Sequence, residues 1–189
     1  MPRILLLSGS ETGLEKLRAL LSELPEAEIC AFPGAGDAER EGGINGCDLI
    51  VIYPPLSDCD GFELAEKLLK RETAGVLIVV KKETPAQAYL KAEEGGAVIL
   101  EKPFTKDMFT ALSRSCLASR RRMERLGERA EQLESRVEET KLVGRAKCVL
   151  IQYLNMTETQ AHRYIEKQSM DMRMSRTAVA MGILRTYES

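Results

Sequence analysis

The residues most able to do chemistry lie in the last third of the chain, and they are of two kinds. Arginine and lysine side chains can pair with phosphate groups. Amide, imidazole and phenol side chains can hydrogen-bond to unpaired bases or stack on them. The basic set is Arg145, Lys147, Arg163, Lys167, Arg173 and Arg176, and the polar set is Gln160, His162, Tyr164 and Gln168. This mixture indicates a nucleic-acid surface, although Tyr164 also fits a core position and His162 a solvated one.

Groupings typical of catalysis are missing from the sequence. His162 is the one histidine, and there is no phosphate-binding loop, nucleophile elbow or zinc-protease motif. The cysteines lie far apart without a CxxC pair, which is typical of reduced, buried thiols in a cytosolic protein. They are Cys30, Cys47, Cys59, Cys116 and Cys148. We therefore expect a cytoplasmic protein that is not an enzyme and has no metal or cofactor.

Charge is distributed unevenly along the chain. Residues 1–110 contain 12 Lys and Arg against 19 Asp and Glu, whereas residues 141–189 contain 8 against 4. An anionic partner would therefore meet the C-terminal end. No apolar run approaches the roughly 18–20 residues that a membrane span needs, so we expect no membrane partner.

The N-terminal half alternates short apolar runs with helical patterns. Continuously apolar runs predict strands buried on both faces, as in a parallel sheet. The predicted strands are 3–7, 27–32, 48–53, 76–80 and 97–100, and the predicted helices between and after them are 13–24, a short one near 34–46, 61–71, 85–94 and 105–117. This order predicts an α/β domain with a doubly wound (βα)₅ sheet.

A long helix follows the predicted sheet. Apolar or small residues step alternately by four and three from Leu112 through Cys116, Met123 and Leu133 to Gly144, which is the pattern of a coiled-coil seam. A narrow stripe of this kind needs a partner, and we expect a parallel homodimer through residues 112–144. The alternative is a solvated linker helix.

Three short helices are predicted at the C-terminal end. Residues 141–154 form the first, and Asn155-Met156 interrupts it. Thr157 and Gln160 fit a capping box at the start of the second helix, which runs to about Met172. Ser175 caps a third helix that runs through Tyr187. The expected domains are therefore 1–118, a coiled-coil linker 110–140, and an all-α three-helix module 137–189.

The first 118 residues resemble the receiver domain of bacterial response regulators, which has a flavodoxin-like (βα)₅ fold. The resemblance rests on the segments RILLL (3–7), DLIVIYPPLSDCDGFEL (48–64) and EKPF (101–104). The resemblance implies two-component phosphorelay signal transduction. It also implies Mg²⁺ and phosphate sites at defined positions, of which the chain retains only Lys102. Ser8 and Gly9 replace the acidic pair, Tyr53 replaces the phosphorylated aspartate, and Val80 replaces the switch hydroxyl.

These replacements have a direct chemical consequence. Mg²⁺ takes oxygen ligands, typically carboxylates, and an acyl phosphate forms only on a carboxylate. Ser8, Gly9 and Tyr53 supply neither, and Asp58 and Asp60 lie farther along the loop. We therefore expect a pseudo-receiver that is not phosphorylated and that serves dimerisation, or the sensing of a protein or small ligand.

The tail resembles the ANTAR module, an RNA-binding three-helix domain of bacterial antiterminators. The resemblance rests on RAKCVL (145–150), Thr157, AHR (161–163) and Met170-Asp171. This sequence departs from the family at Cys148, where glycine is usual. The resemblance implies recognition of RNA hairpins in transcript leaders and transcription antitermination.

Three hypotheses follow from the sequence. The leading one is a dimeric RNA-binding antiterminator. The second is a DNA-binding response regulator with a helix-turn-helix-like tail. The third is a protein-interaction scaffold that binds no nucleic acid.

Overall fold

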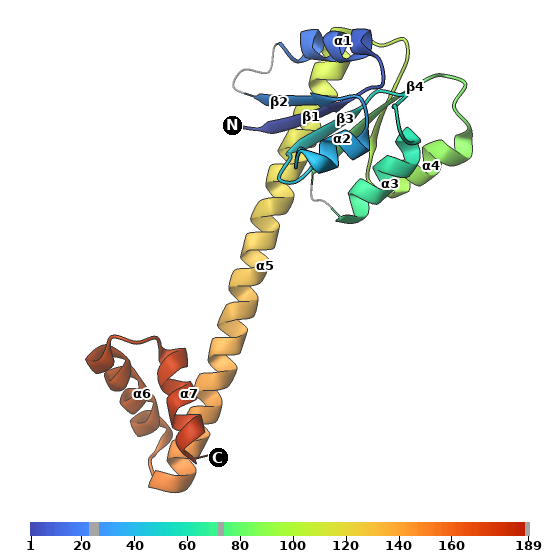
Figure 1. The fold of residues 1–189 in the computed structure, drawn as a ribbon. Helices are drawn as coiled ribbons and strands as arrows, with labels where there is room; N and C mark the ends of the chain where they lie inside the picture. Colours follow the sequence, from blue (N-terminus) through green and yellow to red (C-terminus); the bar gives the residue numbers. More distant parts are fainter. Residues whose placement is uncertain (23–26, 72–73, 188–189) are drawn as a thin grey trace. The chain divides into compact units, whose positions relative to one another are not determined.

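The computed structural model of the chain describes residues 1–22, 27–71 and 74–187. They form two compact units, Met1–Arg125 and Leu126–Ser189, and each unit is described by itself (Figure 1). No helix in the described ranges combines the length and apolar character needed to cross a membrane.

The first unit is built on a five-stranded parallel sheet in the order β2-β1-β3-β4-β5. Its strands are β1 (Arg3–Leu7), β2 (Glu28–Phe32), β3 (Leu49–Ile52), β4 (Gly75–Val80) and β5 (Val98–Glu101). Ile4 pairs with Ile29 on one side and with Leu49 on the other, so β1 lies inside the sheet. The predicted doubly wound fold is confirmed. No strand boundary differs from its predicted position by more than one residue.

Helices cover both faces of this sheet because alternate strand residues point to opposite sides. Leu5, Ile50 and Ile78 pack against α2 (Ala35–Arg40), α3 (Gly61–Arg71) and α4 (Ala86–Glu94). Ile4, Val51 and Leu77 pack against α1 (Glu11–Leu21) and the first turns of α5. The central strands β3 and β4 are apolar throughout because neither of their faces meets water, whereas the edge strands β2 and β5 each contain an exposed glutamate. The predicted helix 13–24 begins two residues earlier, and its last two predicted positions lie outside the described residues.

Helix α5 (Lys106–Leu154) is continuous over 49 residues. The sequence predicted overlapping helices here, over residues 105–117, onward to Gly144 and over 141–154, and the structure joins them into one helix. Neither proline nor a capping residue interrupts it, and its two glycines, Gly127 and Gly144, have open space around the Cβ position. A glycine costs a helix about 1 kcal/mol, which is too little to end one of this length.

The second unit closes around a small core at the end of α5. Helix α6 (Glu158–Met172) and helix α7 (Arg176–Tyr187) bury Ala161, Ile165 and Leu184 against Ala146 and Leu150 of α5. The predicted capping box is confirmed: the backbone N–H of Gln160 donates to Thr157 Oγ1, and the backbone N–H of Thr157 donates to Gln160 Oε1. Ser175 Oγ accepts from Ala178 N at 3.1 Å, as expected for the cap of the third helix.

Tyr153 lies at the edge of this core, in the last turn of α5. Its surface is 54% exposed, and its ring centre lies 5.5 Å from that of Tyr187.

Candidate functional site

The strongest candidate for a binding surface in the second unit is one face of α6. Gln160, Arg163, Tyr164 and Lys167 recur at helical spacing and are all exposed, whereas Ala161 and Ile165 point into the core. Tyr164 is 38% exposed, so its ring is available at the surface. We call these four residues the α6 face. It combines two cations and an aromatic ring, which can contact phosphates and unstacked bases, with the Gln160 side chain, which the capping box holds.

Lys147 has a local partner. Its Nζ lies 2.6 Å from Glu158 Oε1, and its side chain is only 24% exposed. The pair joins α5 to the first turn of α6, and the hydrogen bond from Lys147 lowers the pKa of Glu158. In this structure the ammonium therefore fastens two helices, and binding a phosphate would require it to share or leave Glu158.

Other predicted contact residues also have structural partners. His162 Nε2 lies 3.3 Å from Glu166 Oε1, and Arg176 lies 3.2 Å from Glu139 of α5. Arg173 adopts a left-handed conformation, φ 52°, at the end of α6. Gln168 is half-buried and Arg145 is exposed. The structure therefore brings four of the ten predicted residues together on the α6 face and spreads the others around the unit.

The sequence interpretation did not single out three exposed methionines near the end of α6. Met170 and Met172 lie in its last turn and Met174 follows it, with 71%, 59% and 48% of their surfaces exposed. The alternation MDMRM was visible in the sequence. Methionine is flexible and polarisable, so each of these side chains can adapt to an apolar surface.

In the first unit, the strand-end positions have no room for an acidic pair. Ser8 is fully buried. Gly9 N donates to Pro55 O at 2.7 Å, so the loop after β3 lies directly against it. A Cβ added at Gly9 would lie 2.9 Å from Pro55 O, closer than a normal contact allows. A carboxylate at this position would therefore require the loop to move.

Tyr53 and Lys102 contact each other where the acceptor aspartate and the lysine would otherwise meet. Lys102 Nζ lies 3.6 Å from the centre of the Tyr53 ring. This is a cation–π contact, in which the ring's negative face replaces a carboxylate as the partner of the ammonium. Val80, at the switch position, is buried and presents no hydroxyl. None of these three side chains can accept a phosphoryl group as an acyl phosphate.

Two nearby carboxylates act as helix caps. Asp58 accepts from the backbone N–H groups of Ala35 at 3.1 Å and of Gly36 at 2.6 Å, and the Gly36 hydrogen bond lowers the pKa of this carboxyl. Asp60 Oδ1 accepts from Phe62 N and Glu63 N at the start of α3. Both acids hold α2 and α3 in place. Across the described ranges, no three His, Cys, Asp or Glu side chains are grouped to hold a metal ion.

Comparison with known proteins gives matches that cover both units of the chain. Residues 131–184 match the ANTAR domain family. The transcriptional regulatory protein PdtaR of Mycobacterium tuberculosis strain H37Rv is 27% identical over 188 residues, covering 98% of this chain and 91% of PdtaR.

Solved structures match the fold as well. A two-component response regulator from Clostridium difficile is 25% identical with a TM-score of 0.54, covering 62% of this chain and 97% of that one. Response regulator StyR, at 18% identity, matches 98% of this chain and 99% of its own with a TM-score of 0.66. At that identity, the StyR likeness concerns the fold alone.

Proposed function

We propose that this chain, in which residues 131–184 match the ANTAR domain family and the N-terminal unit has a receiver-like fold, is a response regulator that binds RNA. In this proposal the α6 face engages hairpins in transcript leaders and so controls transcription termination. The protein acts in the bacterial cytoplasm as a dimer, and its N-terminal unit works without aspartyl phosphate.

The composition of the α6 face carries the RNA proposal. Arg163 and Lys167 lie one turn apart, and Tyr164 lies between them on the same exposed surface. Sequence-specific RNA recognition commonly stacks unpaired bases on aromatic rings while cations hold the phosphates. A helix face that reads duplex DNA needs several side chains reaching base edges, and here Gln160 is already held in the capping box.

The exposed seam of α5 supports the dimer. Leu112 and Cys116, the first seam members, pack against the sheet, so the open part of the seam begins at Ser119. Met123 is 64% and Leu133 is 60% exposed in the single chain. A second copy of the same helix in parallel would cover these side chains by knobs-into-holes packing. Two RNA-binding units on one dimer would gain affinity by linkage.

RNA binding is tested with a hairpin enriched from a pool of transcript leaders on the full-length protein. Arg163→Ala with Lys167→Ala should weaken binding at least about tenfold at fixed salt and lower the salt slope by about one per lost contact. Lys67→Ala with Lys70→Ala removes the same charge from α3 and should change affinity less than twofold. Equal losses in both variants, or stronger binding to duplex DNA in competition, would overturn the assignment.

The dimer is tested by Leu126→Asp with Leu133→Asp, which should convert it to a monomer in sedimentation experiments. Gln132→Asp with Ser135→Asp adds the same charge off the seam and should leave the dimer intact. A wild-type protein that sediments as a monomer at tens of micromolar contradicts this part of the proposal.

Independence from phosphorylation has its own test. Incubation with acetyl phosphate and Mg²⁺ should leave the intact mass unchanged, because Tyr53 offers no carboxylate. A Mg²⁺-dependent phosphoryl adduct within residues 1–118 would show that the N-terminal unit is an active receiver.

A further inference from the structure

Four lysines gather around one hollow at the carboxyl ends of the strands. The hollow has a volume of about 400 Å³ and is lined by Lys16, Lys81, Lys82, Glu83, Lys102, Pro103 and Phe104. We call it the basic hollow. Its excess of positive charge is unexpected, because residues 1–110 carry seven more acidic than basic side chains.

Three separate elements bring these lysines together. Lys16 lies on α1, Lys81 and Lys82 follow β4, and Lys102 follows β5. Lys102 N donates to Val80 O at 2.9 Å, which joins the two strand ends. The Thr84 hydroxyl donates to Lys81 O at 2.7 Å and closes the turn that carries Lys81 and Lys82. The backbone that positions the ammonium groups is therefore fixed by hydrogen bonds.

The four ammonium groups of this hollow form no ion pairs with the carboxylates of the described residues. In the described part of the chain, no carboxylate oxygen lies within 4.0 Å of the Lys16, Lys81, Lys82 or Lys102 ammonium. Glu83 is the only acid among the lining residues, and the half-buried Lys102 rests on the Tyr53 ring. Asp58 and Asp60 accept hydrogen bonds from backbone N–H groups at the starts of α2 and α3, and Asp60 also lines the neighbouring hollow.

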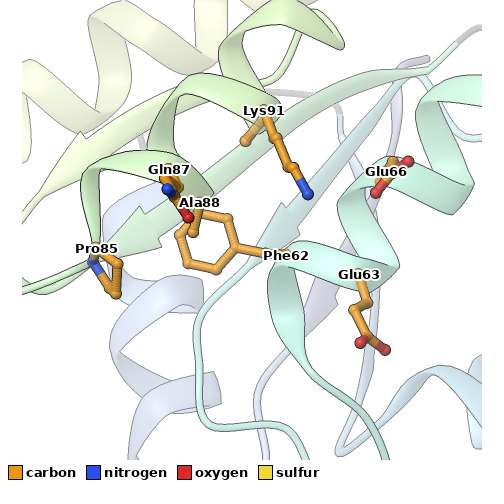
Figure 2. A pocket seen from close by; sticks show the side chains of 8 residues that line it. Phe62, Glu63, Glu66, Pro85, Gln87, Ala88 and Lys91 are labelled. Atoms are coloured by element: carbon orange, nitrogen blue, oxygen red, sulfur yellow. The ribbon is translucent and has the colours of Figure 1, made fainter.

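A second hollow shows what a balanced lining looks like. Figure 2 shows the hollow between α3 and α4, about 320 Å³ in volume, where Lys91 extends from α4 on the same side as Glu66 of α3. Lys70 and Lys91 both lower the pKa of Glu66. Opposite charges neutralise each other there, so that hollow has no preference for an anion.

The basic hollow continues into an apolar one. A neighbouring hollow of about 400 Å³ shares Lys81, Glu83 and Lys102 with it. Its other walls include Pro54, Leu56 and Phe62 together with Val79 and Val80. Small-molecule sites commonly combine an apolar wall with a few convergent polar groups, at the carboxyl ends of the strands in open α/β sheets.

The geometry points to a binding site for a small organic phosphate, with its phosphate groups among Lys16, Lys82 and Lys102 and its apolar body against Pro54, Leu56 and Phe62. Ammonium groups on three elements can surround a phosphate from several sides. The adjoining apolar wall favours a small organic molecule over a nucleic-acid backbone. This site lies in the Met1–Arg125 unit and does not rest on RNA binding by the α6 face.

The experiment uses full-length protein and inorganic pyrophosphate as the probe of the phosphate subsite, followed by ³¹P line width. Pyrophosphate should bind the wild type, and Lys16→Gln with Lys82→Gln should weaken it at least about tenfold. Lys70→Gln with Lys91→Gln, the matched control on α3 and α4, should stay within twofold. ATP should bind more tightly than pyrophosphate because its base and ribose can use the apolar wall.

Circular dichroism on both variants verifies that they fold. The proposal is overturned if pyrophosphate does not bind, or if both double variants weaken it equally, since the latter means general attraction to charge. It is also overturned if ATP binds no better than pyrophosphate. If Lys16→Gln with Lys82→Gln weakens hairpin RNA as much as pyrophosphate, the lysines belong to the RNA surface and the small-molecule assignment is wrong.

Discussion

The two units hold their positively charged side chains in different surroundings, one around a hollow and the other on an exposed helix face. In the first unit, lysines from three elements converge on a hollow at the strand ends. In the second, Arg163 and Lys167 stand on the exposed face of a single helix beside Tyr164. A concave lysine set can surround a small anion, whereas a protruding helix face can enter a groove or loop of a larger one. Charge alone does not distinguish these roles, and the geometry around the charge does.

The largest expected effect comes from disrupting only one of the two cores. Ile165 is 1% exposed and packs in the second core, so Ile165→Asp buries a charge and should cost on the order of 4 kcal/mol or more there. Hydrogen exchange should then show loss of protection in α6 and α7, with the sheet still protected. Loss of protection in both units together would mean that they do not unfold separately.

Two glycine substitutions should change the free energy of unfolding by intermediate amounts, and in opposite directions in the two units. Gly9→Ala places a Cβ 2.9 Å from backbone atoms of the β3–α3 loop and should destabilise the first unit by about 1–3 kcal/mol. Gly127→Ala meets nothing within 4 Å and should stabilise α5 by about 0.5–1 kcal/mol. Thermal unfolding followed by circular dichroism measures both. A neutral Gly9→Ala would show that the loop yields easily and that an acidic residue could be accommodated.

The smallest expected effect is on stability at acidic pH and comes from replacing Lys147. The Glu158 pKa is lowered from its ordinary 4.5 by Lys147, so the pair's stabilisation is complete above about pH 4.5 and is lost as the pH falls through the lower folded value. Lys147→Met should slightly lower the unfolding midpoint at pH 7 and flatten its fall below pH 4.5. If the variant instead loses RNA affinity with an unchanged midpoint, Lys147 serves the RNA and not the helix junction.

Much of the fold could be predicted from the sequence because its signals are local. Buried strands such as residues 3–7 are continuous apolar runs, and the Thr157–Gln160 capping box is a four-residue pattern. Helix α5 joins segments that the sequence predicts as overlapping helices, because no residue among them ends a helix.

The sites were harder to predict because they depend on contacts between distant residues. Nothing in the sequence pairs Lys147 with Glu158 or places Lys102 on Tyr53. Lys16 and Lys82 are 66 positions apart, and only the topology of the sheet brings them to one hollow. The α6 face could be predicted in part, because helical spacing places Arg163, Tyr164 and Lys167 on one side once the helix boundaries are known.

The most direct test compares hairpin RNA affinity in two double variants at one salt concentration. Arg163→Ala with Lys167→Ala should lose at least about tenfold, and Lys16→Gln with Lys82→Gln should remain within twofold of the wild type. That result would assign RNA to the α6 face and leave the basic hollow for a smaller ligand. Full affinity in the α6 variant, with loss in the lysine variant, would contradict the account.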